Sequence, residues 1–193
     1  MSETNLAVTG EPEADELLRR DPLALLIGML LDQQMPIERA FVAPYRLQER
    51  TGHPLDAHHI ADLAPDDLAA VFRQPPALHR YWGSMSQRTQ TLCRFVVDTY
   101  DGDAGAIWRD VDSGAELFRR VRELPGYGEQ KAKIFVAMLA KRFAIRPDGW
   151  EKATTPYSDN QPRSVADIDS PDALLQVRAF KKSMKEKAKA AKE

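Results

Sequence analysis

The sequence predicts an all-α protein, and three observations support this fold class. Apolar residues recur at the three- and four-residue spacing of a helix face, most clearly at Leu92, Phe95, Val96 and Tyr100. No segment keeps the alternation of apolar and polar residues that a half-buried strand requires. Short clusters rich in Asp, Gly and Pro interrupt the helical pattern and supply helix caps. We expect roughly eight to ten helices.

The elements follow from these interruptions. Residues 1–16 are acidic and polar, and we interpret them as a mobile lead-in rather than a signal or transit peptide. A helical domain is predicted over 17–153, a polar, turn-rich linker over 154–171 and a basic helical tail over 172–193. Within the helical domain, breaks with a capped helix beyond each are expected at 64–66, 101–103 and 112–114.

The composition restricts the classes of function. The apolar run over 22–31 is too short to cross a membrane, so no membrane partner is expected. Cys93 is the only cysteine, which excludes an internal disulfide and suits a reducing cytoplasm. Because it lies among apolar residues of a predicted helix, we expect a buried, unreactive thiol. The four histidines lack the spacing of metal ligands, so no metal site is predicted: they are His53, His58, His59 and His79.

The charge is unevenly distributed along the chain. Residues 181–193 carry six lysines and two glutamates, and the remaining residues have a net charge of −6. An acidic body is therefore joined to a basic tail. Two interpretations of the tail stay open: it binds nucleic acid by neutralising phosphates, or it is a solvated end that aids solubility.

Leu124-Pro125-Gly126-Tyr127-Gly128 separates two helical patterns. The glycines permit a tight turn, and the proline disfavours continuation of the first helix. The second helix then begins with unpaired backbone N–H groups at its positive dipole end. Such a helix start attracts anions, and a DNA phosphate is an obvious guest. The plain alternative is a tight interhelical turn that binds nothing.

This stretch resembles the helix-hairpin-helix motif of the endonuclease III superfamily of base-excision DNA glycosylases. In that family a Gly/Pro-rich loop and an essential Asp follow, and Asp148 lies at the matching position, 22 residues beyond Gly126. Far upstream, Leu31-Asp32-Gln33-Gln34 is similar to the end of the family's early buried helix, which carries a glutamine pair. The three motifs occur in the family's order between about residues 20 and 150. The resemblance implies an endonuclease III-like helical fold.

The resemblance also implies a DNA N-glycosylase that acts on a damaged or mispaired base in double-stranded DNA. The base must be turned out of the duplex, and Gln34, beside Gln33, would fill the gap it leaves. Asp148 would stabilise the positive charge that develops on the sugar and deprotonate the attacking water. Phosphate contacts are expected from the hairpin and the helix that follows it, at Gly126, Gly128, Gln130, Lys131 and Lys133.

Strand-cutting members of the family hold a lysine where this chain has Gln130. Lys131 is one residue later, about 100° around the helix, so it does not simply substitute. We therefore predict hydrolysis without a Schiff base or strand cleavage. The iron–sulfur cluster of many relatives needs four cysteines and is not expected, nor is any other cofactor. A monomeric, cytoplasmic protein is expected, associated with the nucleoid if the source is bacterial.

Four aromatic residues are candidates for stacking on the flipped base, although a single aromatic is more often part of a core. They are Tyr127, Trp150, Tyr45 and Trp82.

The plainer interpretations also stay open. Asp148 before Gly149 matches an ordinary turn, and Gln34 could simply cap its helix. Beyond Asp148 the chain departs from the family, because a short polar segment replaces a helix that carries His or Arg. Two other functions therefore remain: a module that binds damaged DNA without catalysis, and an adaptor whose lysine-rich tail binds an acidic protein.

Overall fold

The structure is a computed structural model, and it describes residues 5–190. That part of the chain is all-helical, as predicted, and its only strand-like pairing is a single bridge between Ser113 and Asp148. The α-helices are α1 (Pro12–Arg20), α2 (Pro22–Leu31), α3 (Ile37–Thr51), α4 (Ala57–Asp62), α5 (Pro65–Arg73), α6 (Trp82–Tyr100), α7 (Gly114–Glu123), α8 (Glu129–Arg142), α9 (Trp150–Thr154) and α10 (Pro171–Ala190). Two 3₁₀ turns, η1 (Ala104–Ile107) and η2 (Val165–Asp167), complete the order.

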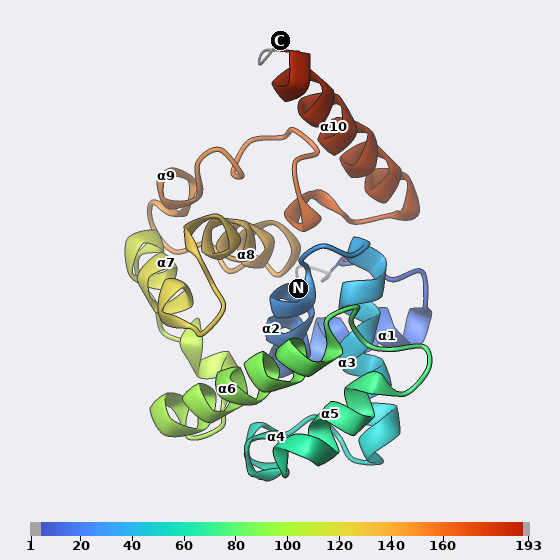
Figure 1. Cartoon of the computed structure of the whole chain (residues 1–193). Coiled ribbons are helices and arrows are strands. Elements are labelled where there is room, and N and C mark those ends of the chain that lie inside the picture. Colours follow the sequence, from blue (N-terminus) through green and yellow to red (C-terminus); the bar gives the residue numbers. More distant parts are fainter. Residues whose placement is uncertain (1–4, 191–193) are drawn as a thin grey trace.

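Helix α2 lies at the centre of the fold. Asp21 starts it by accepting the N–H groups of Leu23 and Ala24, and Pro22 supplies a backbone suited to a first helical turn. Every residue from Leu23 to Leu31 is buried, so the helix is apolar on all sides. It packs against α1, α3, α6 and η1, and α8 lies beside it in Figure 1.

The predicted hairpin joins α7 to α8. Ser113 caps α7 by accepting the N–H of Glu116, and Leu124 is the C-cap residue that follows the helix. Gly126 has φ +86°, a conformation that side chains rarely adopt, and a Cβ at this position would lie 2.4 Å from Leu30 Cδ1 of α2. A glycine is therefore required both by the turn and by its close approach to α2.

Residues 5–16 are more ordered than the sequence predicts. Residues 1–16 were expected to be a mobile lead-in; positions 1–4 lie outside the described residues, but Leu6 and Val8 are fully buried and α1 begins at Pro12. The Asp15 carboxylate accepts the N–H groups of Val8 and Thr9, which holds this segment against α1. The prediction was wrong because it weighed overall polarity and overlooked two isolated apolar side chains.

The expected polar linker at 154–171 is also part of the folded body. Val165, Ala166 and Ile168 are buried, and η2 packs against α8. Lys141 Nζ of α8 lies 2.6 Å from Asp167 Oδ1 and donates to the Asp159 carbonyl, also at 2.6 Å. Polar residues therefore attach this segment through buried contacts, which a composition-based interpretation cannot anticipate.

The tail is helical where the structure describes it. Helix α10 covers Pro171–Ala190, while 191–193 lie outside the described residues, and Val177 is its single fully buried residue. Across residues 5–190, no helix combines the length and the apolar character needed to cross a membrane.

Candidate nucleic-acid interface

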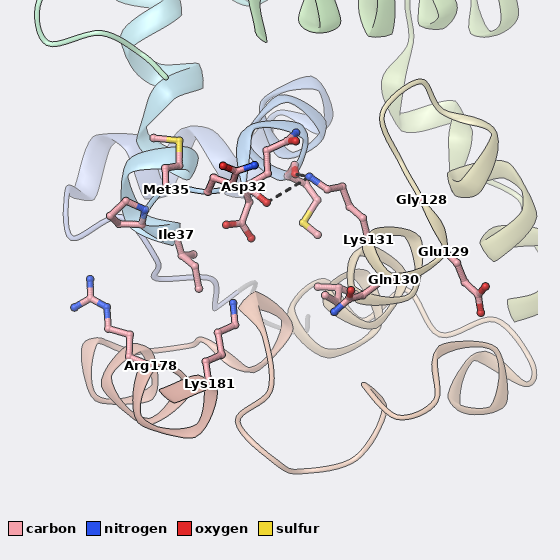
Figure 2. Close-up of a pocket in the computed structure, with 14 residues that line it drawn as sticks. Asp32, Met35, Ile37, Gly128, Glu129, Gln130, Lys131, Arg178 and Lys181 are labelled. Carbon is pink, nitrogen blue, oxygen red and sulfur yellow. Dashed lines mark hydrogen bonds between the residues drawn. The ribbon is translucent and has the colours of Figure 1, made fainter. Parts of the chain in front are cut away.

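The glutamine pair and the hairpin border one pocket of about 710 Å³. One wall is the end of α2 and the loop to α3, a second is the start of α8, and a third is one side of α10 (Figure 2). A volume of this order falls in the range typical of small-molecule sites. Of the residues predicted to contact DNA, the pocket is lined by Gln33, Gln34, Gly128, Gln130 and Lys131.

The start of α8 presents unpaired donors to this pocket. Gly128 is the N-cap residue and has an extended conformation. Among the described residues, no side chain caps this end of the helix. The first intrahelical bond runs from Ala132 N–H to the Gly128 carbonyl, so the N–H groups of Glu129, Gln130 and Lys131 precede the helical ladder. These are the amides that the sequence predicts to hold a phosphate.

The glutamine loop is held in a conformation that costs free energy. Gln34 has φ +54°, which is uncommon for a residue other than glycine, and its side chain is exposed. Tyr81 Oη donates to Gln34 Oε1 at 3.2 Å, and Arg88 donates to Gln33 Oε1 at 3.3 Å. The two glutamine side chains are therefore held by one residue just before α6, Tyr81, and by one residue within it, Arg88.

Buried His79 fixes the backbone of the same loop. Its Nδ1 accepts the Tyr81 N–H at 3.0 Å, so the proton of the neutral ring lies on Nε2, which donates to the Gln33 carbonyl at 3.0 Å. Burial lowers the pKa of His79. The neutral ring thus hydrogen-bonds to the residue just before α6 and to the loop that follows α2.

Lys131 joins the two segments that the sequence predicts to contact DNA, the end of α2 and the start of α8. Its Nζ donates to the carbonyls of Met29 at 2.5 Å and Leu30 at 3.0 Å, at the C-terminal end of α2 (Figure 2). A cation here complements the negative end of the α2 dipole. Burial lowers its pKa to about 8, and the nearby Asp32 carboxylate opposes part of that shift.

Two acidic residues line the pocket, Asp32 and Glu129, and Glu129 is paired with Lys133. Among the described residues, no hydrogen bond reaches the side-chain oxygens of Asp32, and burial raises the pKa of its carboxyl while Lys181 and Lys131 lower it. Perturbed carboxyls in pockets are typical of functional sites. Sequence reasoning quoted Asp32 only as part of the glutamine motif, although a charged residue that ends a ten-residue apolar run was the available signal.

Asp148 lies outside this pocket and is exposed. Its N–H donates to the Asp112 carbonyl at 3.1 Å, and its carbonyl accepts the Gly114 N–H at 2.8 Å. These bonds hold Asp148 beside the first residue of α7. The hairpin follows the other end of that helix. Gly114 permits the approach, because a Cβ there would lie 2.4 Å from the Trp150 Cα.

Three residues predicted to contact DNA make contacts within the protein: Gln130 in the pocket lining, and Lys133 and Gly126 outside it. Lys133 forms an ion pair with Glu129 at 2.9 Å on an outer turn of α8, and Gln130 Nε2 donates to Tyr157 Oη at 2.9 Å. Gly126, at the turn of the hairpin, packs its backbone against Leu30. None of these three contacts needs DNA to be satisfied.

The four aromatic candidates do not line the pocket. Tyr127 is 4% exposed and its hydroxyl donates to the Leu26 carbonyl at 2.7 Å, so its ring is part of the core and unavailable for stacking. Tyr45 packs on the core with the Arg46 guanidinium over its ring, Trp82 lies under Arg73, and Trp150 begins α9. Tyr81, which sequence reasoning overlooked, is 43% exposed beside Gln34.

A scan against protein-family models, a search of curated proteins and a search of solved structures each found no match to this chain.

Proposed function

We propose that this chain is a base-excision DNA repair protein that hydrolyses the N-glycosidic bond of a damaged or mispaired base. One observation carries the proposal: the glutamine pair and the hairpin amides, about a hundred residues apart in sequence, border the same pocket. A flipped base needs a pocket, a side chain to occupy its former place and a grip on the flanking phosphate. The three requirements meet on one surface.

Gln130 and the surroundings of Lys131 support hydrolysis rather than strand cleavage. Gln130 stands where a strand-cutting relative has lysine, and an amide cannot form a Schiff base. Lys131 directs its Nζ at carbonyls of α2, which occupy the protons of the ammonium group. Water is therefore the expected nucleophile.

Two carboxylates are candidates for activating that water and for stabilising the charged sugar. Asp148 is favoured by the resemblance, and Asp32 by its position in the pocket. A carboxylate in a site with little water interacts more strongly with developing positive charge than one in water. The two assignments make opposite predictions for single Asn substitutions.

The experiment is a panel of duplexes that carry alkylated, oxidised or deaminated bases, followed by hot alkali to cleave abasic sites. Wild-type product from one lesion supports the proposal. Its loss in Asp148→Asn or in Asp32→Asn, with DNA binding retained, identifies the working carboxylate, and Asp112→Asn, which neutralises a neighbour of Asp148, is the matched control. Borohydride trapping of a covalent complex through Lys131 would contradict hydrolysis.

The exposed position of Asp148 favours a second candidate, a module that binds damaged DNA without turnover. Such a module binds lesion duplexes more tightly than intact ones yet yields no alkali-labile product from any lesion in the panel.

A further inference from the structure

Five cations lie on one side of α10. At about 100° per residue they fall within an arc of roughly 100°, and the rise of 1.5 Å per residue spreads them over about 16 Å. We refer to this set as the basic stripe, and all five members are exposed: Arg178, Lys181, Lys182, Lys185 and Lys189. Lys187 lies on the opposite side of the same helix, about 180° from Arg178.

The stripe runs from the folded body into solvent. Val177 anchors α10, and the Arg163 guanidinium lies 5.4 Å from the centre of the Phe180 ring. From Met184 onward every described residue of the helix is exposed, and Figure 1 shows this end of α10 beyond the other helices. Its second half is therefore accessible from all sides.

The stripe begins at the pocket. Arg178 and Lys181 extend from α10 and line the wall that faces the end of α2, with the start of α8 beside it (Figure 2). Arg178 is paired with Glu38, and the charge of Lys181 acts on the Asp32 carboxyl, so these two cations are partly compensated. Within residues 5–190, no ion pair involves Lys182, Lys185 or Lys189.

The charge pattern defines the partner. Lys181, Lys185 and Lys189 are four residues apart, a spacing at which like charges weaken a helix, and a line of anions relieves that repulsion. Outside residues 181–193 the chain has a net charge of −6, so its body as a whole repels a polyanion. A stripe of about 16 Å covers about five base pairs of duplex, whose phosphates recur every 3.4 Å along each strand.

We propose that the basic stripe binds the phosphates of a DNA duplex and aligns it across the pocket. The choice of DNA as the polyanion rests on the proposed function. The stripe supplies sequence-independent affinity, whereas the pocket and the glutamine pair select the base.

The test measures binding to an intact duplex by fluorescence anisotropy over a series of KCl concentrations. The triple variant Lys182→Gln/Lys185→Gln/Lys189→Gln spares the pocket lining. Each lost phosphate contact lowers the slope of log affinity against log salt by about 0.9, so the triple variant should lose up to about 2.7. Lys185→Gln should lose about 0.9. Lys187→Gln removes one charge from the other side of the helix and should leave the slope unchanged.

Slopes that are equal in wild type and the triple variant overturn the inference, and so does a Lys187→Gln effect as large as that of Lys185→Gln. Binding of wild type to anionic phosphatidylserine vesicles, without salt-dependent DNA binding, overturns it in favour of a membrane surface. If the triple variant loses DNA affinity as expected while wild type yields no product in the lesion panel, the stripe stands and only the glycosylase activity falls.

Discussion

Three residues around the pocket are held at an electrostatic or conformational cost in free energy. Lys131 is a cation with little water around it, Asp32 is a half-buried carboxyl whose pKa is raised by burial, and Gln34 has a left-handed backbone. Each arrangement opposes stability, and their concentration around one pocket is typical of a functional site. Unfolding experiments on single variants can measure the effects of Lys131 and Gln34 on stability separately.

The pH dependence of stability should reveal Lys131. Its pKa is about 8 in the folded protein and about 10.4 in an unfolded chain, so the unfolded state binds more protons between these values. The free energy of unfolding therefore gains a rising contribution from Lys131 as the pH increases from 8 to 10, of about 1.4 kcal/mol per pKa unit at most. Urea unfolding of wild type and Lys131→Met at pH 8, 9 and 10 isolates this contribution as a difference.

Lys133→Met is the control, because Lys133 lies on the same helix in an exposed ion pair. Its difference from wild type should not rise over this pH range. A difference for Lys131→Met that stays flat would contradict the lowered pKa.

Because of the left-handed backbone of Gln34, we expect one substitution there to affect thermal stability and DNA affinity differently. Asn tolerates the left-handed region better than Gln and is shorter by one methylene. Gln34→Asn should keep or slightly raise the melting temperature, yet weaken binding to a lesion duplex several-fold. Thermal unfolding and anisotropy measure the two effects, and Gln48→Asn, within the regular helix α3, controls for the shortened side chain. Unchanged lesion affinity would remove Gln34 from the interface.

At the scale of elements, the hairpin and α2 form one unit. Gly126 touches Leu30, the Tyr127 hydroxyl bonds to the Leu26 carbonyl, and Lys131 binds the last carbonyls of α2. Two residues of the hairpin turn and one residue in the first turn of α8 thus contact the same helix. The hairpin conformation consequently depends on the packing of α2 as well as on its own sequence.

Alanine substitutions at two glycines should separate backbone strain from packing. Gly126 and Gly10 both have positive φ, at +86° and +76°, but a Cβ at Gly10 meets nothing within 4 Å. Gly10→Ala should cost about 1 kcal/mol from strain alone. Gly126→Ala adds a clash with Leu30 and should cost at least 1 kcal/mol more. Urea unfolding measures both, and equal costs would show that α2 yields freely to the hairpin.

At the scale of the whole molecule, two truncations test whether the segment at 154–171 belongs to the folded body or is a linker. A chain ending at Asp169 loses Val177, the one fully buried residue of α10, and should still unfold cooperatively. A chain ending at Pro162 also loses Val165, Ala166 and Ile168 and leaves Lys141 without Asp167. Burial of Val165 and of Ile168 contributes about 1.5–3 kcal/mol each, so we expect the second truncation to unfold at a much lower temperature. Calorimetry compares the two, and similar melting temperatures would restore the linker interpretation.

The sequence predicted those features that depend on local pattern. The helix periods, the buried Cys93 and the glycine hairpin are present, and so are the side-chain caps at two of the three predicted breaks, Asp103 and Ser113. The break at 64–66 is present, but the helix that follows has Ala64 as its N-cap residue and no side-chain cap. The sequence missed features made by distant contacts: the burial of Leu6, the attachment of η2 to α8 and the pocket roles of Asp32 and Lys181. Tyr127 shows the same limit, since only the proximity of Leu26 shows that its ring belongs to the core.

The tie between Lys131 and α2 has a thermodynamic consequence for recognition. The glutamine loop follows α2 and the hairpin amides begin α8, so the side chain that joins these helices sets their separation before any partner arrives. Little conformational entropy remains to be lost at these two contacts on association. Free and bound forms should therefore superimpose closely around the pocket, and the ordering that does accompany binding should be concentrated in the outer turns of α10.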